Sequence, residues 1–156
     1  NSYAVKAYRE AVSIKDEREP VLHAYSIMKS PVLTLDPEMK IIDAWNLFKK
    51  KGVSHMPVFA NNKILGIVSD RDILRYLIIV DNKIENNSDK TVREIMTDHV
   101  ITAGRLTDIR RIAKAMFENH IGTMPIVEDD GTLTGIITRS DILYALINYP
   151  PLNLWV

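Results

Sequence analysis

The chain of 156 residues has 46% apolar residues, 20 basic and 20 acidic side chains, and therefore a formal net charge of zero. This is the composition of a globular protein, the absence of cysteine excludes disulfides and cysteine-ligated metals, and the balanced charge gives no basic footprint for nucleic acid. Because no apolar run is long enough to cross a bilayer, we expect a soluble, cytoplasmic protein without nucleic-acid or membrane partners.

The predicted elements begin with an N-terminal flank, residues 1–19, in which apolar side chains recur at the spacing of an amphipathic helix. A first unit, residues 20–80, follows. Its predicted elements are a strand at Val32–Leu35, a helix from Pro37 to Gly52, a hairpin of strands Met56–Phe59 and Ile64–Val68, and a helix from Ser69 that carries Ile73, Leu74, Leu77 and Ile78. Residues 81–91 are polar and rich in asparagine, which predicts a solvated linker.

A second unit, residues 92–147, repeats this order. Its predicted elements are a helix from Asp108 to Asn119, strands at Met124–Val127 and Thr132–Ile137, and a helix from Arg139 on. Residues 148–156 form an unusually apolar tail, which we expect to dock in a groove instead of being solvated.

Three sequence blocks occur twice in the same order. The blocks Ile27–Thr34, Val53–Val58 and Gly66–Leu74 return as Ile95–Thr102, Ile121–Ile126 and Gly135–Leu143. The offset grows by one residue before the third block, where Asn61-Asn62 faces Asp129-Asp130-Gly131. Since a turn tolerates an insertion, the pattern predicts two copies of a strand–helix–strand–strand–helix unit that pack on each other.

The ordered set of motifs resembles a tandem pair of cystathionine-β-synthase (CBS) domains over about residues 20 to 147. The matching motifs are the Met-Lys/Thr opening at Met28 and Met96, the Met-Pro strand, and the closing Gly-apolar-apolar-Ser/Thr-x-x-Asp. The resemblance implies an α/β (α+β) fold in which two βαββα repeats pack with pseudo-twofold symmetry. It also implies two clefts between the sheets that commonly hold adenosine-containing ligands, and a flat homodimer of two such pairs.

Two aspartates, Asp72 and Asp141, lie three residues after Ser69 and Thr138. This spacing predicts a capping box, in which a hydroxyl and a carboxylate satisfy backbone N–H groups at the start of a helix. A carboxylate can also accept both hydroxyls of a ribose, and the resemblance implies this contact. The two roles are compatible, because one side chain can cap a helix and line a cleft.

Two threonines, Thr34 and Thr102, close the first predicted strand of each unit. As β-branched residues they are equally well explained as ordinary strand formers. The resemblance implies a second role, in which Thr102 reaches the ligand held by Asp72, and Thr34 reaches the ligand held by Asp141.

The hairpin strands Met56-Pro57-Val58 and Met124-Pro125-Ile126 are apolar. We expect their methionines to fill the core. The edges of these strands can still form an apolar slot for an adenine ring, with backbone N–H and C=O groups recognising the base.

Side chains that face phosphate differ between the two units. His55 and Thr123 occupy matching positions, and a basic residue there can bind phosphate in the family; His55 can do so when protonated, whereas Thr123 carries no charge. Arg71 and Arg139 are further candidates because guanidinium groups suit phosphate oxygens, although a solvated surface or an ion pair explains each arginine equally well. We therefore predict that the two sites are not equivalent.

The remaining residues form no catalytic constellation. The histidines His23, His55, His99 and His120 lack the spacing of metal ligands, and no nucleophile, base and oxyanion donor can be assembled. We expect a regulatory module, not an enzyme, that needs no cofactor and binds AMP, ADP, ATP or S-adenosylmethionine to alter its contact with a regulated protein. The alternative is a ligand-free homodimerisation module whose clefts are filled by side chains, with Met56 or Met124 plugging the slot.

Overall fold

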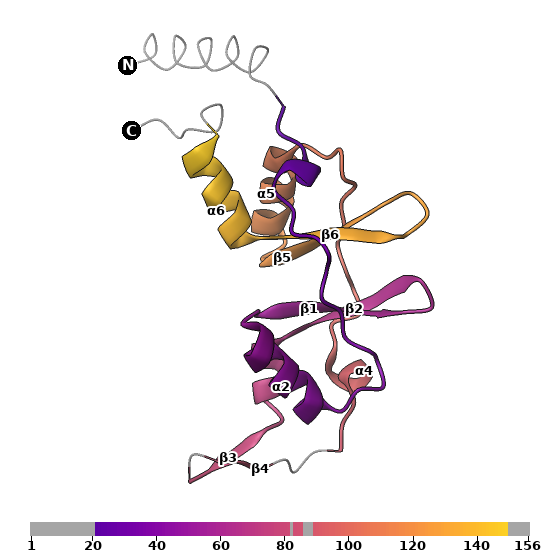
Figure 1. The fold of residues 1–156 in the computed structure, drawn as a ribbon, viewed down its shortest axis with the longest axis vertical. Coiled ribbons are helices and arrows are strands. Elements are labelled where there is room, and N and C mark those ends of the chain that lie inside the picture. The colour runs from indigo at the N-terminus through magenta and orange to yellow at the C-terminus, as the bar shows by residue number, and fades with distance from the viewer. Residues whose placement is uncertain (1–20, 82, 86–88, 150–156) are drawn as a thin grey trace.

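The computed structural model describes residues 21–81, 83–85 and 89–149 (Figure 1). Its elements, in chain order, are the short 3₁₀ helix η1 (Ala24–Ser26), α2 (Ile41–Lys51), β1 (His55–Ala60), β2 (Lys63–Ser69), α3 (Asp70–Leu74), β3 (Ile78–Val80), β4 (Lys83–Glu85), α4 (Val92–Ile95), α5 (Ile109–Glu118), β5 (Thr123–Val127), β6 (Leu133–Thr138) and α6 (Arg139–Asn148). The predicted N-terminal helix, and the apolar tail beyond Tyr149, lie outside the described residues.

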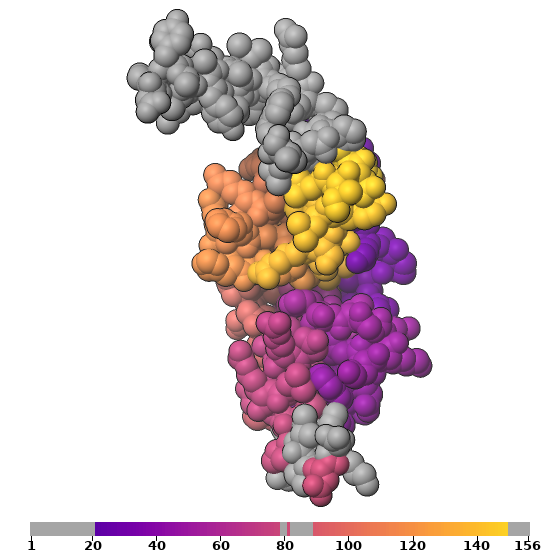
Figure 2. All heavy atoms as spheres, turned by 90° about the vertical axis from the view of Figure 1, so that its left-hand side faces the viewer, coloured from indigo at the N-terminus to yellow at the C-terminus, as the bar shows by residue number. Residues whose placement is uncertain are grey.

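Two similar halves stack along the long axis of the molecule (Figures 1 and 2). Each half contains a helix, an antiparallel hairpin and a second helix: α2, β1, β2 and α3 in the first, and α5, β5, β6 and α6 in the second. Both hairpins carry a register shift at the equivalent position, after Val58 in β1 and after Ile126 in β5. The expected α/β fold of two repeats is therefore confirmed.

The first crossing segment, residues 27–35, connects the two hairpins. Lys29 pairs with Ile136 in β6 of the second half, and Leu35 then pairs in parallel with Val58 in β1 of its own half. Of the predicted strand Val32–Leu35, only Leu35 forms a β-bridge. The segment crosses from one hairpin to the other, so it cannot run alongside either of them for several residues.

The second crossing segment, residues 95–103, repeats this path in the opposite direction. Thr97 pairs with Ile67 in β2 of the first half, and Ala103 pairs with Ile126 in β5 of its own half. The halves are thus joined by two chain segments that exchange places, which brings residues of both repeats to one boundary.

The first helix of the first repeat starts later than predicted. Residues after Asp36 form a turn, in which its carboxylate accepts the N–H of Glu38 at 2.8 Å, and α2 begins only at Ile41. The helix ends as predicted at Gly52, which adopts the left-handed conformation with φ of 63° that glycine allows without strain.

The second helix of the first repeat is shorter than predicted. It ends at Leu74, and Ile78 begins strand β3, which pairs with β4 after a turn that starts at Asp81 with φ of 49°. The expected solvated linker therefore contains a strand at residues 83–85. Aspartate tolerates the left-handed backbone. The segment that we predicted to be a linker therefore contains a residue suited to a hairpin turn.

Each half has its own buried cluster, and each cluster takes a residue from the other repeat's part of the chain. Ala24, which precedes the first repeat's helices, packs in the second cluster with Met124, while Val92 packs in the first cluster with Met56. Within the described part of the chain, none of the helices has the length and apolar character needed to cross a bilayer.

Candidate ligand-binding clefts between the repeats

Two cavities between the halves share His55, Ser69, Asp72, His120 and Gly122, and together they form what we call the Asp72 cleft. One part, of about 210 Å³, has a mostly apolar surface; it is also lined by Ile67, Val100, Ile101 and Ile121, together with the polar Thr97, His99 and Thr123. The other part, of about 460 Å³, is highly charged and is also lined by Asp70, Arg71, Arg75 and Arg139. Since Asp72 lines both parts, its carboxylate lies where the apolar end meets the basic end.

The carboxylate of Asp72 has one oxygen committed to the fold. Its Oδ2 accepts the backbone N–H of Ser69 at 2.9 Å and the Ser69 hydroxyl at 2.7 Å, which completes the predicted capping box of α3. Its Oδ1 has the guanidinium of Arg75 at 4.0 Å, beyond hydrogen-bond distance. The side chain is 26% exposed, so Oδ1 can accept a hydrogen bond from a ligand in the cleft.

The carboxylate of Asp141 has a similar cap but a different neighbour. Its Oδ2 accepts the N–H and the hydroxyl of Thr138, both at 2.8 Å, in the capping box of α6. Its Oδ1 forms an ion pair with Nζ of Lys29 at 3.1 Å, and only 10% of the Asp141 side chain is exposed. Both capping predictions are confirmed. The second aspartate is paired with a cation from a side chain that is 66% exposed, whereas the first lines an open cleft.

His55 and Thr123 both line the Asp72 cleft. Burial lowers the pKa of His55 below its ordinary value; the carboxylates of Asp70 and Asp72 oppose this shift, while Arg139 and Arg71 add to it. A pKa below 6.5 favours the neutral imidazole at pH 7, and phosphate binding by a protonated His55 stays a prediction.

The Thr123 hydroxyl is a buried polar group with no hydrogen-bond partner among the described residues. Only 4% of this residue is exposed. Since a buried hydroxyl without a partner costs about 1–3 kcal/mol, Thr123 places an unsatisfied polar group in the wall of the cleft.

Arg139 and Arg71 both line the basic end, and their contact with phosphate stays a prediction. A Cβ added to Gly122 would lie 3.8 Å from the guanidinium carbon of Arg139 and 3.6 Å from Cε1 of His55. Gly122 therefore lies between these two side chains and leaves room beside them.

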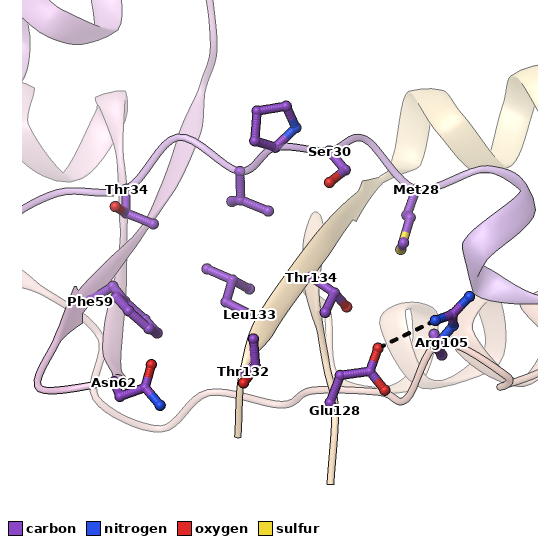
Figure 3. A pocket seen from close by; sticks show the side chains of 12 residues that line it. Met28, Ser30, Thr34, Phe59, Asn62, Arg105, Glu128, Thr132, Leu133 and Thr134 are labelled. Atoms are coloured by element: carbon purple, nitrogen blue, oxygen red, sulfur yellow. Dashed lines mark ion pairs between the residues drawn. The ribbon is translucent and has the colours of Figure 1, made fainter. Parts of the chain in front are cut away.

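Thr34 lies in a different cavity, of about 630 Å³, between the ends of the two hairpins. Figure 3 shows it across that cavity from Glu128 and Arg105, which form an ion pair at 3.8 Å. Asp141 is not among the lining residues, so this cavity does not join Thr34 to Asp141.

Thr102 is exposed and is absent from the lining of the Asp72 cleft, although Val100 and Ile101 of the same segment are present. The predicted contact of Thr102 with a ligand held by Asp72 stays a prediction, and in this structure Val100 and Ile101 line that cleft instead. These residues, like Thr97, were missed because only the crossing of the chain carries them to the first repeat.

The Met-Pro strands are core elements. Met56, Val58, Met124 and Ile126 have at most 1% exposure, and the prolines between them are buried as well. The methionines belong to the two hydrophobic clusters and not to the lining of the Asp72 cleft, so the core interpretation is confirmed and neither methionine plugs this cleft. In the described residues, no three histidine or acidic side chains gather in a way that suits a metal ion.

Comparison with known proteins gives a consistent result for both repeats. The family model described as CBS domain matches residues 24–79 and 92–148. The chain is 33% identical over 150 residues to uncharacterized protein MJ1426 of Methanocaldococcus jannaschii, covering 78% of this chain and 89% of that protein. It is 34% identical to uncharacterized protein MJ1232 of the same organism, covering 78% of this chain but 38% of that protein.

Some relatives are much longer than this chain. An inosine-5'-monophosphate dehydrogenase of Korarchaeum cryptofilum is 31% identical over 124 residues, which are 80% of this chain and 24% of the enzyme. The match is therefore to a minor part of that protein.

Among solved structures, the CBS domain pair of protein MJ0100 in complex with methylthioadenosine and S-adenosyl-L-methionine has a TM-score of 0.70 and 28% identity, covering 81% of this chain and 97% of that one. The structure of CBSX2 in complex with AMP also has a TM-score of 0.70, with 25% identity, covering 82% of this chain and 98% of that one.

Proposed function

The chain belongs to the CBS domain family, and we propose that it is a regulatory module that binds an adenine nucleotide in the Asp72 cleft. The observation that carries this proposal is the meeting of an apolar end, a carboxylate oxygen left over from a helix cap, and a basic end in a single cleft. Binding would alter how the module contacts a regulated protein, and the chain itself would catalyse no reaction.

The apolar end suits an adenine ring. Ile67, Val100, Ile101 and Ile121 come from both repeats, and small-molecule sites are mostly apolar with a few well-placed polar groups. A base bound between them would bridge the two halves. Oδ1 of Asp72, where the two ends meet, would then accept the ribose hydroxyls.

The basic end favours phosphate. Arg71, Arg75 and Arg139 line it, and guanidinium groups bind phosphate oxygens through paired N–H donors. S-adenosylmethionine carries a positive sulfonium in place of phosphate, so these arginines disfavour it relative to AMP. The known complex of CBSX2 with AMP is consistent with this choice.

The hydroxyl of Thr123 has no partner among the described residues but is itself buried in the cleft wall, so a ligand would bond it only after a local movement of that wall. A ligand that bridges the repeats also has the differential affinity for two states that any regulatory response requires.

The first experiment is a thermal-shift titration with AMP. At about a hundred times its Kd, a ligand adds about 2.7 kcal/mol to the free energy of unfolding, which corresponds to a rise in Tm of about 5–10 °C for a chain of this size. Asp72→Asn removes the charge of the acceptor while keeping its shape and its capping oxygen, so we expect this variant to lose the AMP-dependent rise. Methylthioadenosine, which has no phosphate, should raise Tm less than AMP does.

The matched control is Asp129→Asn, which removes a carboxylate from the exposed tip of the second hairpin and should leave the AMP shift unchanged. An equal AMP shift in the wild type and in Asp72→Asn would contradict the assignment of the cleft. No shift in the wild type would favour the alternative of a ligand-free dimerisation module.

Dimerisation has support of its own in the second repeat. Phe117 on α5 and Leu143 on α6 line an apolar groove of about 450 Å³ and are 81% and 60% exposed, and Tyr144 and Ile147 add to the exposed apolar surface of α6. We propose that a second copy of the chain covers this α5/α6 face, since large exposed apolar patches mark interaction sites.

A further inference from the structure

Lys29 and Thr97 occupy the same place in the two repeats. Each exchanges two backbone hydrogen bonds with the hairpin of the other half, Lys29 with Ile136 at 2.9 and 3.0 Å, and Thr97 with Ile67 at 2.9 Å in both directions. Each is thereby held next to the capping aspartate of the other repeat's final helix, Asp141 for Lys29 and Asp72 for Thr97.

The side chains at this shared position differ in whether they leave the free oxygen of the facing aspartate accessible. Thr97 is short and is part of the wall of the Asp72 cleft. Lys29 instead extends its ammonium to 3.1 Å from Oδ1 of Asp141. In both aspartates Oδ2 serves the helix cap, so the ammonium takes up the one carboxylate oxygen that a ligand would need.

We infer that Lys29 takes the place of a ligand at Asp141, so that the chain binds one nucleotide, at Asp72, and not two. This inference rests on the proposed function, because it concerns the counterpart of the proposed site. A ribose that approached Asp141 would have to displace the Lys29 ammonium, on a side chain that is 66% exposed, from a carboxylate that is 10% exposed. A charged donor holds a carboxylate more strongly than hydroxyls do.

Charge strengthens the asymmetry. At Asp72, Oδ1 has Arg75 at 4.0 Å, and Arg75 lines the end of the cleft where the proposed phosphate would lie. A cation there assists the nucleotide without occupying the acceptor, whereas Lys29 occupies the acceptor itself. Lys29 therefore determines which of the two clefts accepts a ligand.

The test is a calorimetric titration of the full chain with AMP that measures the number of sites. We expect one AMP per chain for the wild type, lost in Asp72→Asn. Lys29→Thr, which places in the first repeat the side chain that the second repeat has at Thr97, should bind two AMP per chain. The double variant Lys29→Thr with Asp72→Asn should bind one.

The matched control is Lys63→Thr, the same change at an exposed lysine of β2, which should leave one AMP per chain. Two sites in the wild type, or a single site in Lys29→Thr that Asp72→Asn abolishes, would overturn the role of Lys29 and leave the proposed function intact. Binding in the wild type that is lost in Lys29→Thr would also overturn it, because Lys29 would then hold AMP instead of excluding it. Absence of AMP binding in every variant would overturn the proposed function and this inference with it.

Discussion

Opposing influences determine the pKa of His55, which lines the Asp72 cleft. Burial lowers its pKa below 6.5, and although Asp70 and Asp72 act in the opposite direction, the net shift is downward. The imidazole therefore enters the cleft as a neutral group that can accept or donate one hydrogen bond. A nucleotide phosphate placed beside it would favour the protonated form and raise the pKa again.

The lowered pKa makes stability depend on pH. Above pH 6.5 His55 is neutral in both the folded and the unfolded chain, so its contribution is complete; as the pH falls through 6.5 towards the folded pKa, the unfolded chain binds the extra proton and stability is lost. We expect the free energy of unfolding to fall between pH 7.5 and pH 5.5 more steeply in the wild type than in His55→Gln, as measured by urea denaturation.

The control for this prediction is His99→Gln, which removes an exposed histidine and should keep the wild-type pH profile. If the free energy of unfolding depended on pH equally in the wild type and in His55→Gln, the titration of His55 would not contribute to the pH dependence of stability.

At the scale of elements, the two crossing segments lie unusually close to the hairpins that they join. A Cβ at Gly66 in β2 would lie 2.8 Å from the carbonyl oxygen of Thr97 and 2.7 Å from Sδ of Met96. At the equivalent Gly135 in β6, the side chain of Met28 takes up the corresponding space. The glycines of the closing motif are thus required for close approach and not for a special backbone conformation.

We predict that Gly66→Ala disturbs the Asp72 cleft from outside it. The added methyl group would push the backbone of Thr97 away from β2, at a cost of about 1–3 kcal/mol typical of overpacking, and Thr97 is part of the cleft wall. Chemical denaturation should show the loss of stability, and AMP titration should show weaker binding.

Gly104→Ala offers the matched comparison, because its Cβ would meet nothing closer than 3.8 Å. This variant should retain both stability and AMP affinity. If Gly66→Ala also retained wild-type stability and AMP affinity, the crossing segment could move away from β2 without changing the cleft, which would contradict the prediction.

At the scale of the whole molecule, the two halves stack end to end, and α5 and α6 of the second half lie on the surface. Figure 2 shows the atoms of α6, in yellow, on the face turned to the viewer. The α5/α6 face carries Phe117, Leu143, Tyr144 and Ile147, all more than half exposed. Covering this face with a second copy would remove these four apolar side chains from water.

We therefore predict that Phe117→Asp shifts the chain from dimer to monomer in sedimentation velocity at micromolar concentration. A charge placed in an apolar interface is costly to bury, whereas at a position that is 81% exposed it should leave the fold of the single chain unchanged, as a thermal melt can check. Leu106→Asp, which alters a 68% exposed residue outside α5 and α6, should remain dimeric. A wild type that sediments as a monomer would contradict the proposal.

The sequence by itself determined the features that depend on neighbouring residues. The repeat, the two hairpins with their turns, and the capping boxes of Asp72 and Asp141 follow from short-range spacing, because a helix cap or a hairpin is formed by residues a few positions apart. The same reasoning placed both methionines of the Met-Pro strands in the core. It failed at Leu77 and Ile78, where a continuing helix and a hairpin strand are both compatible with the local pattern.

Only the tertiary structure decided which residues share a cleft. Thr97, Val100 and Ile101 reach Asp72 because the chain crosses between the halves, and Lys29 reaches Asp141 by the same exchange. The sequence predicted that the two sites differ, but it attributed the difference to His55 and Thr123. Contacts between residues far apart in the chain depend on how the repeats pack, and no local spacing records that packing.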